Sequence, residues 1–141
     1  KWDLLKKETY TMKSFQDNIR YQFKSLDNYP MIFISTLTKQ RIHQVLQTGW
    51  DVYQKGKNVV STSKLNENLI KIIEKNPPPA EQGKLIKIKY ATQVSREPAV
   101  IALYTNYPDK IKISYQRYIE NQIRKVFDYN GIPLVLSFRK K

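Results

Sequence analysis

The sequence predicts an α/β fold in two parts, a slice of a doubly wound domain over residues 1–57 and a three-stranded sheet with covering helices over residues 58–141. Three observations predict it. Four segments place apolar residues at spacings of three and four, as amphipathic helices do. One short unbroken apolar run, MIFIS, is typical of a strand that is covered on both faces. Later apolar runs are bounded by proline, glycine and asparagine, as strands are.

The first part is interpreted as a helix, a buried strand at residues 31–35, a loop at residues 35–40 and a second helix. In doubly wound sheets, ligands bind beyond the carboxyl ends of the strands, which makes this loop a candidate site. The helices are predicted from two apolar stripes: Met12, Phe15, Ile19, Phe23 and Leu26, and then Ile42, Val45, Leu46, Trp50 and Tyr53, which ends near a glycine C-cap at Gly56.

The second part is interpreted as helix, strand, strand, helix and strand. Ser61 or Ser63 can cap the first helix, and the prolines at 77–79 stop it. Its sheet is expected to be covered on one side by the helices, because that arrangement buries all the apolar faces together. The first strand, at residues 85–94, is predicted to present Ile86, Ile88 and Tyr90 on an apolar face and Lys87 and Lys89 on a basic face.

The remaining elements follow from turn signals and from spacing. A second strand follows Pro98, and a last strand follows the Asn130-Gly131 turn. Between them lies a helix over residues 114–127. Tyr115 and Tyr118 of this helix could stack on nucleic-acid bases, but their helical spacing favours packing in the core.

Net charge, cysteine content and the length of apolar runs limit the kinds of function that the chain can have. The 25 basic and 12 acidic residues give a net charge of +13, with +5 up to residue 57 and +8 beyond it. Such a charge favours a nucleic-acid partner, an anionic membrane surface being the second candidate and an inert basic surface the third. The absence of cysteine excludes disulfides and cysteine-zinc sites. No apolar run is long enough to cross a bilayer and no secretion signal is visible, so a cytoplasmic protein is expected.

Two short motifs resemble the guanine pocket of GTPases. Lys1-Trp2-Asp3 resembles the end of the asparagine-lysine-x-aspartate motif, and residues 35–40, STLTKQ, resemble the serine-alanine loop. Guanine offers two donors, its ring N–H and its exocyclic amine, which a carboxylate accepts as a pair, and its O6 requires a donor such as a backbone N–H. The resemblance assigns guanine binding to Lys1, Asp3, Ser35, Thr36 and Leu37.

Later segments extend the resemblance to the whole chain. STSKLNENL, KNPPP, GKLIKIKYATQV, SYQRYIENQIRKVF and GIPLVLSFRKK, in this order, are similar to the C-terminal part of the Der (EngA) family of bacterial double GTPases. The resemblance implies the end of a Ras-like second GTPase domain over residues 1–57 and a KH-like α-β-β-α-β domain over residues 58–141. It further implies a cytoplasmic, monomeric GTPase that assists maturation of the large (50S) ribosomal subunit.

The resemblance covers only part of the machinery of such an enzyme. No G-x-x-x-x-G-K-[ST] loop is present, so no catalytic residue is assigned here, and GTP or GDP and Mg²⁺ are expected in the parent protein rather than on this segment. The chain is therefore expected to be a portion of a longer one, with asparagine before Lys1. Two positions depart from the family pattern, Thr36 for alanine and Lys39 for glycine, and Lys39 would be strained if its φ is positive.

In the second part, no pair of glycines has the G-x-x-G spacing of ordinary KH modules. RNA binding is therefore assigned to basic side chains that contact RNA phosphates. The alternative is that the same residues dock onto the first GTPase domain. Two other classes stay open, a free-standing RNA-binding module and an adaptor for an acidic protein. The only histidine, His43, has no ligand partners at metal spacing, so no metal site is predicted. The assigned cations are Lys87 and Lys89 on one strand face, and Arg117, Arg124 and Lys125, which are predicted to lie on the helix away from its apolar stripe and hence exposed.

Overall fold

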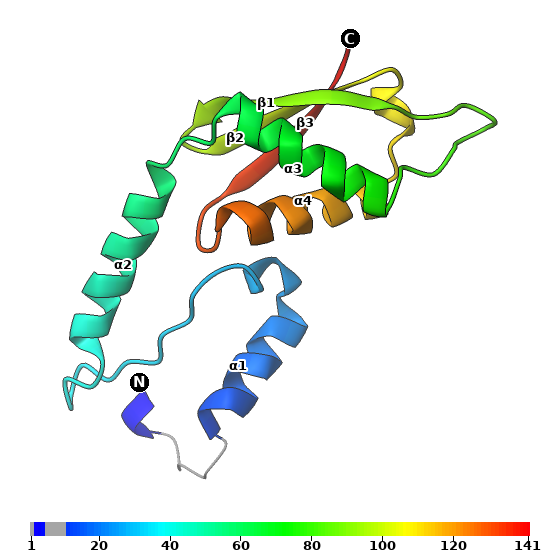
Figure 1. Ribbon diagram of the computed structural model, residues 1–141. Helices are drawn as coiled ribbons and strands as arrows, with labels where there is room; N and C mark the ends of the chain where they lie inside the picture. Colours follow the sequence, from blue (N-terminus) through cyan, green and yellow to red (C-terminus); the bar gives the residue numbers. More distant parts are fainter. Residues whose placement is uncertain (1, 5–10) are drawn as a thin grey trace. The chain divides into compact units, whose positions relative to one another are not determined.

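The computed structural model describes residues 2–4 and 11–141 (Figure 1). Contacts within the chain divide it into two compact units, Lys1–Gln54 and Lys55–Lys141. The predicted boundary between functional domains, at residues 57 and 58, lies close to this division and stays a prediction. None of the helices in the described ranges has both the length and the apolar character that crossing a bilayer requires.

The first unit is built around two helices. A short 3₁₀ turn, η1 (Trp2–Leu4), precedes α1 (Thr11–Gln22), and a second one, η2 (Lys24–Leu26), follows it. The helix predicted over residues 11–26 is thus confirmed with a break at Phe23, whose φ of −126° and ψ of 76° are not helical. The second predicted helix is confirmed as α2 (Ile42–Gly56).

The strand predicted at residues 31–35 is wrong for this chain. The described residues form no strand there, only an isolated bridge between Ser35 and Gln40 and a backbone hydrogen bond of 3.0 Å from the Trp2 N–H to the Ile34 carbonyl. A strand is defined by a ladder of backbone hydrogen bonds, and no described segment of the first unit supplies one. The apolar residues of the run, 31–34, are half-buried instead of fully buried.

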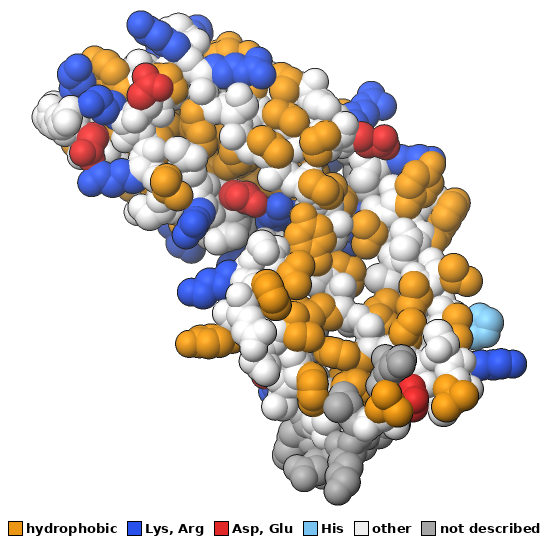
Figure 2. Space-filling model, turned by 180° about the vertical axis from the view of Figure 1, so that it is seen from behind, with side chains coloured by type: hydrophobic (Ala, Val, Ile, Leu, Met, Phe, Trp, Pro, Cys, Tyr) orange, Lys and Arg blue, Asp and Glu red, His pale blue; other side chains and the backbone are white. Residues whose placement is uncertain are grey.

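The apolar stripes of both helices in the first unit are largely exposed. Phe15 of α1 is 39% exposed, whereas Leu46 and Trp50 of α2 are 71% and 57% exposed. Figure 2 shows that many hydrophobic side chains reach the surface of the chain. A stripe with this spacing normally faces a core, so these side chains lack the packing partners that their pattern predicts.

The second unit confirms the predicted order of elements. Ser61 caps the first helix, and its hydroxyl oxygen accepts a hydrogen bond from the Lys64 N–H. The three strands lie in the order β1-β2-β3, with β1 antiparallel and β3 parallel to the central strand β2. The elements are α3 (Thr62–Lys75), β1 (Ile88–Arg96), β2 (Ala99–Thr105), η3 (Pro108–Lys110), α4 (Ile113–Phe127) and β3 (Leu134–Lys140).

Helices α3 and α4 lie on one side of the sheet, as Figure 1 shows. The core between them and the sheet contains side chains with no exposed surface, among them Leu65, Ile101, Leu103, Ile119 and Ile123. The side chain of Asn66 joins α3 to the edge strand, because its amide accepts from the Ala91 N–H at 2.7 Å and donates to the Ala91 carbonyl at 2.9 Å. It thereby occupies part of an otherwise unpaired sheet edge.

A β-bulge near the start of β1 corrects the predicted face of Tyr90. The pairing register shifts between Ile88, which lies opposite Thr105, and Tyr90, which lies opposite Tyr104. Thr105 is fully buried, so Ile88 shares the helix-covered face, whereas one extra residue, Lys89, moves Tyr90 to the other face. The prediction that Ile88 and Tyr90 share one apolar face is therefore wrong.

Candidate functional site

The candidate guanine loop, residues 35–40, is closed by hydrogen bonds from its own first residue. The Ser35 side chain is fully buried, and its hydroxyl accepts a hydrogen bond of 3.2 Å from the Thr38 N–H. The Ser35 N–H donates to the Gln40 carbonyl at 3.3 Å. These bonds leave Thr36 and Leu37 exposed at the tip, with Leu37 82% exposed. Ser35 thus stabilises the conformation of the loop, and the tip residues Thr36 and Leu37 are the ones accessible to a ligand.

The short turn η1 lies against the strand-like segment that enters this loop. The Trp2 N–H donates to the Ile34 carbonyl, and the indole is buried against Phe15 and Phe33, with ring centroids 6.0 and 4.9 Å away. Asp3, half-buried, follows Trp2 directly in the sequence, so its backbone lies next to a residue that is bonded to the segment entering the loop. Lys1, which the resemblance also assigns to this pocket, lies outside the described residues.

Lys39 adopts the left-handed conformation, with φ of 56°. This backbone region is unfavourable for residues with a Cβ atom and favourable for glycine. The glycine that the family resemblance places at this position therefore has a physical reason, and Lys39 carries local strain.

Replacing Lys39 with glycine is expected to stabilise the first unit by up to about 1 kcal/mol, because glycine removes the left-handed strain. The measurement is denaturant unfolding followed by tryptophan fluorescence, since both tryptophans, Trp2 and Trp50, lie in this unit. Leu37→Gly is the control, because Leu37 has no positive φ and should gain nothing from the change. Equal effects of the two changes would contradict the strain.

Four of the five predicted phosphate-contacting cations are exposed on the second unit. Lys125 and Arg117 lie on α4, Lys89 forms the bulge of β1, and Lys87 precedes that strand. The backbone of Lys87 is fixed, because its N–H donates to the Asn106 side chain at 2.8 Å. Within residues 2–4 and 11–141, none of these four side chains joins an ion pair, so their charges are available to a partner.

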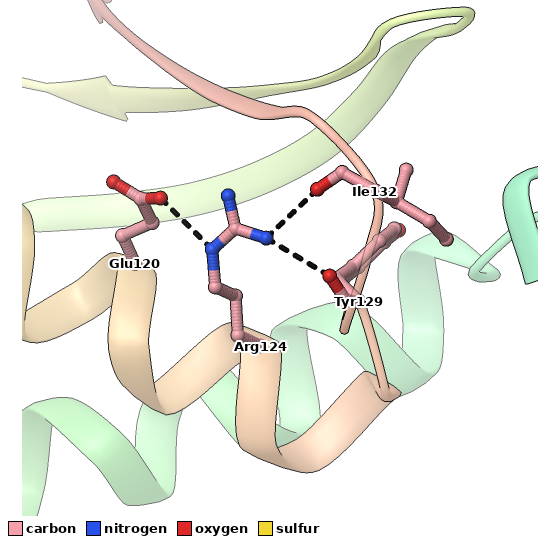
Figure 3. Close-up of polar contacts among 4 residues, drawn as sticks. All are labelled: Glu120, Arg124, Tyr129 and Ile132. Atoms are coloured by element: carbon pink, nitrogen blue, oxygen red, sulfur yellow. Dashed lines mark hydrogen bonds and ion pairs between the residues drawn. The ribbon is translucent and has the colours of Figure 1, made fainter. Parts of the chain in front are cut away.

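The fifth cation, Arg124, is buried, and the prediction that it lies on the exposed side of α4 is wrong. Only 5% of its surface is exposed. Figure 3 shows the guanidinium pointing inward, where Nη1 donates to the carbonyls of Tyr129 at 2.9 Å and Ile132 at 2.8 Å while Nε pairs with Glu120 at 2.9 Å. Its role here is to hold the turn between α4 and β3.

Two pairs of tyrosines lie in ring contact in the second unit. The Tyr115 hydroxyl donates to the carbonyl of Asn76, the C-cap of α3, and the Tyr118 hydroxyl donates to the carbonyl of Ile72 on α3. Burial raises the pKa of Tyr115 to about 12. Core packing of Tyr115 is thus confirmed. Tyr90 and Tyr104 form a second, half-exposed pair on the sheet, which the sequence did not reveal because the bulge sets its register.

No metal centre is visible in the part of the chain that the structure describes. No three His, Asp or Glu side chains gather there at ligand distance. His43 is exposed on α2.

Comparison with known proteins places these features in a family. Residues 60–139 match the profile of the KH-domain-like C-terminal domain of EngA bacterial GTPase enzymes. Over its whole length the chain is similar to proteins named GTPase Der, with 43% identity to that of Amoebophilus asiaticus, 39% to that of Christiangramia forsetii and 40% to that of Streptococcus suis.

The chain spans about a third of the length of these relatives, 33% for the first and 32% for the other two. The matched residues 60–139 include every element from α3 to β3 except the last residue of β3, and the α3-β1-β2-α4-β3 order agrees with the α-β-β-α-β order expected of that domain. The chain therefore belongs to the family of the C-terminal, KH-domain-like region of EngA bacterial GTPases.

Proposed function

We propose that this chain is the closing part of a GTP-binding domain joined to an RNA-binding KH-like domain, within a GTPase that acts in maturation of the large ribosomal subunit. The observation that carries the proposal is a cationic second unit combined with a turn, containing Asp3, whose Trp2 N–H is bonded to the residue before the loop at residues 35–40. Every relative named above is called GTPase Der, which supports a GTPase parent.

In this proposal, the first unit supplies the guanine end of the nucleotide site. The Asp3 carboxylate accepts the two guanine donors, and a backbone N–H at Thr36 or Leu37 donates to O6. The exposed apolar stripes of α1 and α2, and the run at residues 31–35, which joins no strand ladder among the described residues, support a larger sheet supplied by other parts of a parent chain. Mg²⁺ and the phosphates of GTP or GDP would be held by those other parts, so the segment alone is expected to be inactive.

The second unit would contact 23S ribosomal RNA through the exposed cations Lys87, Lys89, Arg117 and Lys125. Phosphate contacts of this kind position a protein without specifying sequence, and they fit a unit with no G-x-x-G loop. The rival uses are docking onto the first GTPase domain of the same chain and binding of an acidic protein. A cytoplasmic, monomeric protein is part of the proposal.

The test is the salt dependence of binding to a 23S ribosomal RNA fragment, measured by fluorescence anisotropy. Affinity should fall linearly on logarithmic axes, with a slope of roughly −0.7 to −0.9 for each phosphate contacted. Neutralising Lys87 and Lys89 together, as Lys87→Gln with Lys89→Gln, should make the slope shallower by about 1 or more. The change should also weaken binding in low salt.

The matched control removes the same charge elsewhere, as Lys64→Gln with Lys71→Gln on α3. Both control side chains are exposed, and Lys71 is already paired with Glu67 at 2.8 Å. This variant should keep the slope of the unmodified chain. Indifference of the unmodified chain to RNA in low salt would reject the RNA proposal in favour of an adaptor, and equal effects of both variants would show attraction by net charge alone.

A further inference from the structure

The sheet of the second unit has one face that no described helix of that unit covers (Figure 1). The strand register arranges nine side chains of this face in three rows across the strands. Asp and Glu are absent from all three rows, and the middle row carries only short side chains. We call this surface the open sheet face. Its rows are Tyr90, Tyr104 and Arg139; Thr92, Ala102 and Ser137; and Ser95, Val100 and Val135.

The first row contains an aromatic stack. The rings of Tyr90 and Tyr104 lie 4.4 Å apart between centroids, at an interplanar angle of 15°. Both side chains are half-exposed, and in the described part of the chain neither hydroxyl has a hydrogen-bond partner. This contrasts with Tyr115, Tyr118 and Tyr129, whose hydroxyls all bond within the unit. The fold therefore uses the rings of the stacked pair but leaves their polar ends to solvent.

Two cations accompany the stack. The Lys141 ammonium lies 5.1 Å from the centroid of the Tyr90 ring, and Arg139, exposed, stands beside Tyr104 in the same row. The Arg139 guanidinium donates to the Ser137 hydroxyl at 3.2 Å, which orients it along the face. An aromatic surface bordered by cations, with no acid in its rows, is complementary to a base together with its phosphate.

We propose that the open sheet face binds unpaired nucleotides of RNA, with a base stacking on the Tyr90–Tyr104 pair and the adjoining phosphate contacting Arg139 and Lys141. Any base can stack on an aromatic side chain, provided that it is not already stacked inside an RNA duplex. The face thus selects single strands over duplex without reading sequence. This inference rests on the proposed RNA-binding function and adds the kind of RNA and the residues that select it.

The test compares a short unstructured RNA oligonucleotide with the same strand annealed to its complement, using the whole 141-residue chain. The unmodified chain should bind the single strand more tightly. Replacing both tyrosines, as Tyr90→Leu with Tyr104→Leu, should weaken single-strand binding about fivefold or more and leave duplex binding within about twofold. Tyr90→Phe with Tyr104→Phe keeps both rings and should bind the single strand as the unmodified chain does.

The matched control is Tyr107→Leu. Tyr107 also pairs with a lysine, since the Lys84 ammonium lies 5.2 Å from its ring centroid, but it lies outside the open sheet face. Its replacement should not change the preference for single strands. Ultraviolet cross-linking of the unmodified chain to the oligonucleotide gives a reading that does not depend on how the variants fold, and the cross-linked peptides should contain Tyr90 or Tyr104.

Two outcomes separate this inference from the function on which it rests. If the folded double-leucine variant keeps its single-strand affinity while the Lys87 and Lys89 variant loses affinity, RNA is held by phosphate contacts alone and the stacking proposal is overturned. Cross-links confined to peptides without either tyrosine would overturn it as well. If the unmodified chain binds no RNA in low salt, the proposed function itself fails.

Discussion

Replacing Arg124 with methionine is expected to lower the free energy of unfolding of the second unit by about 3 kcal/mol. The guanidinium donates to two backbone carbonyls in the turn between α4 and β3 and pairs with Glu120, and it is 95% shielded from solvent, being 5% exposed. Methionine fills part of the volume but offers no donor. The carbonyls of Tyr129 and Ile132 would then lose these bonds in a region where water has little access.

The measurement is urea unfolding followed by far-ultraviolet circular dichroism. Arg117→Met is the matched control, because Arg117 lies on the same helix but is exposed. Its change should stay within about 0.5 kcal/mol. A loss of similar size in both variants would mean that net charge, not the buried hydrogen bonds, determines the effect.

The helices were largely predictable from sequence because their signals are local. The Ser61 cap, the prolines at 77–79 and the apolar spacing within α3 and α4 act over a few residues, and the structure places those helices where these signals predict. The strand predicted at residues 31–35 failed for the opposite reason. An apolar run indicates only that a segment tends to be extended. A strand also requires a neighbouring strand as hydrogen-bonding partner, and the described part of the first unit supplies none.

The exposure of the assigned cations was predictable only where it follows from the spacing of residues along a helix or strand. Lys87, Lys89, Arg117 and Lys125 are exposed as expected, whereas Arg124 is not. The carbonyls that bind Arg124 belong to the turn after α4. The spacing of residues within a helix does not indicate the position of a turn that follows it, so the burial of Arg124 could not be predicted from that spacing. Assignment of these cations to RNA, and of Asp3 and the loop tip to guanine, stays a proposal.

The tyrosine stack was missed because a bulge determines which face receives Tyr90. Strict alternation from Ile86 onward places Tyr90 with the apolar residues, toward the helices. The extra residue at Lys89 reverses this as far as Gln93, where a second register shift follows, so that Ala91 faces the core and Tyr90 meets Tyr104 on the other face. A bulge depends on the partner strand, and a single strand's sequence therefore does not reveal it.

Replacing Ile101 with alanine is expected to destabilise the second unit by about 3 to 4 kcal/mol. Ile101 lies on the central strand, has no exposed surface and faces the side that α3 and α4 cover. Truncation leaves a cavity bounded by the sheet and two helices, which can collapse only partly. Urea unfolding followed by circular dichroism measures the loss, and the fold should be retained in the absence of denaturant.

Val135→Ala is the control that decides whether the sheet is covered on one side only. Val135 lies opposite Val100, one position along from the Ile101–Leu136 pair, and it is 47% exposed on the open sheet face. Its truncation removes little buried surface, so a loss of about 1 kcal/mol or less is expected. Similar losses for Ile101→Ala and Val135→Ala would mean that the open face is packed against protein. Such packing would remove the access that an RNA base needs to reach the tyrosine stack.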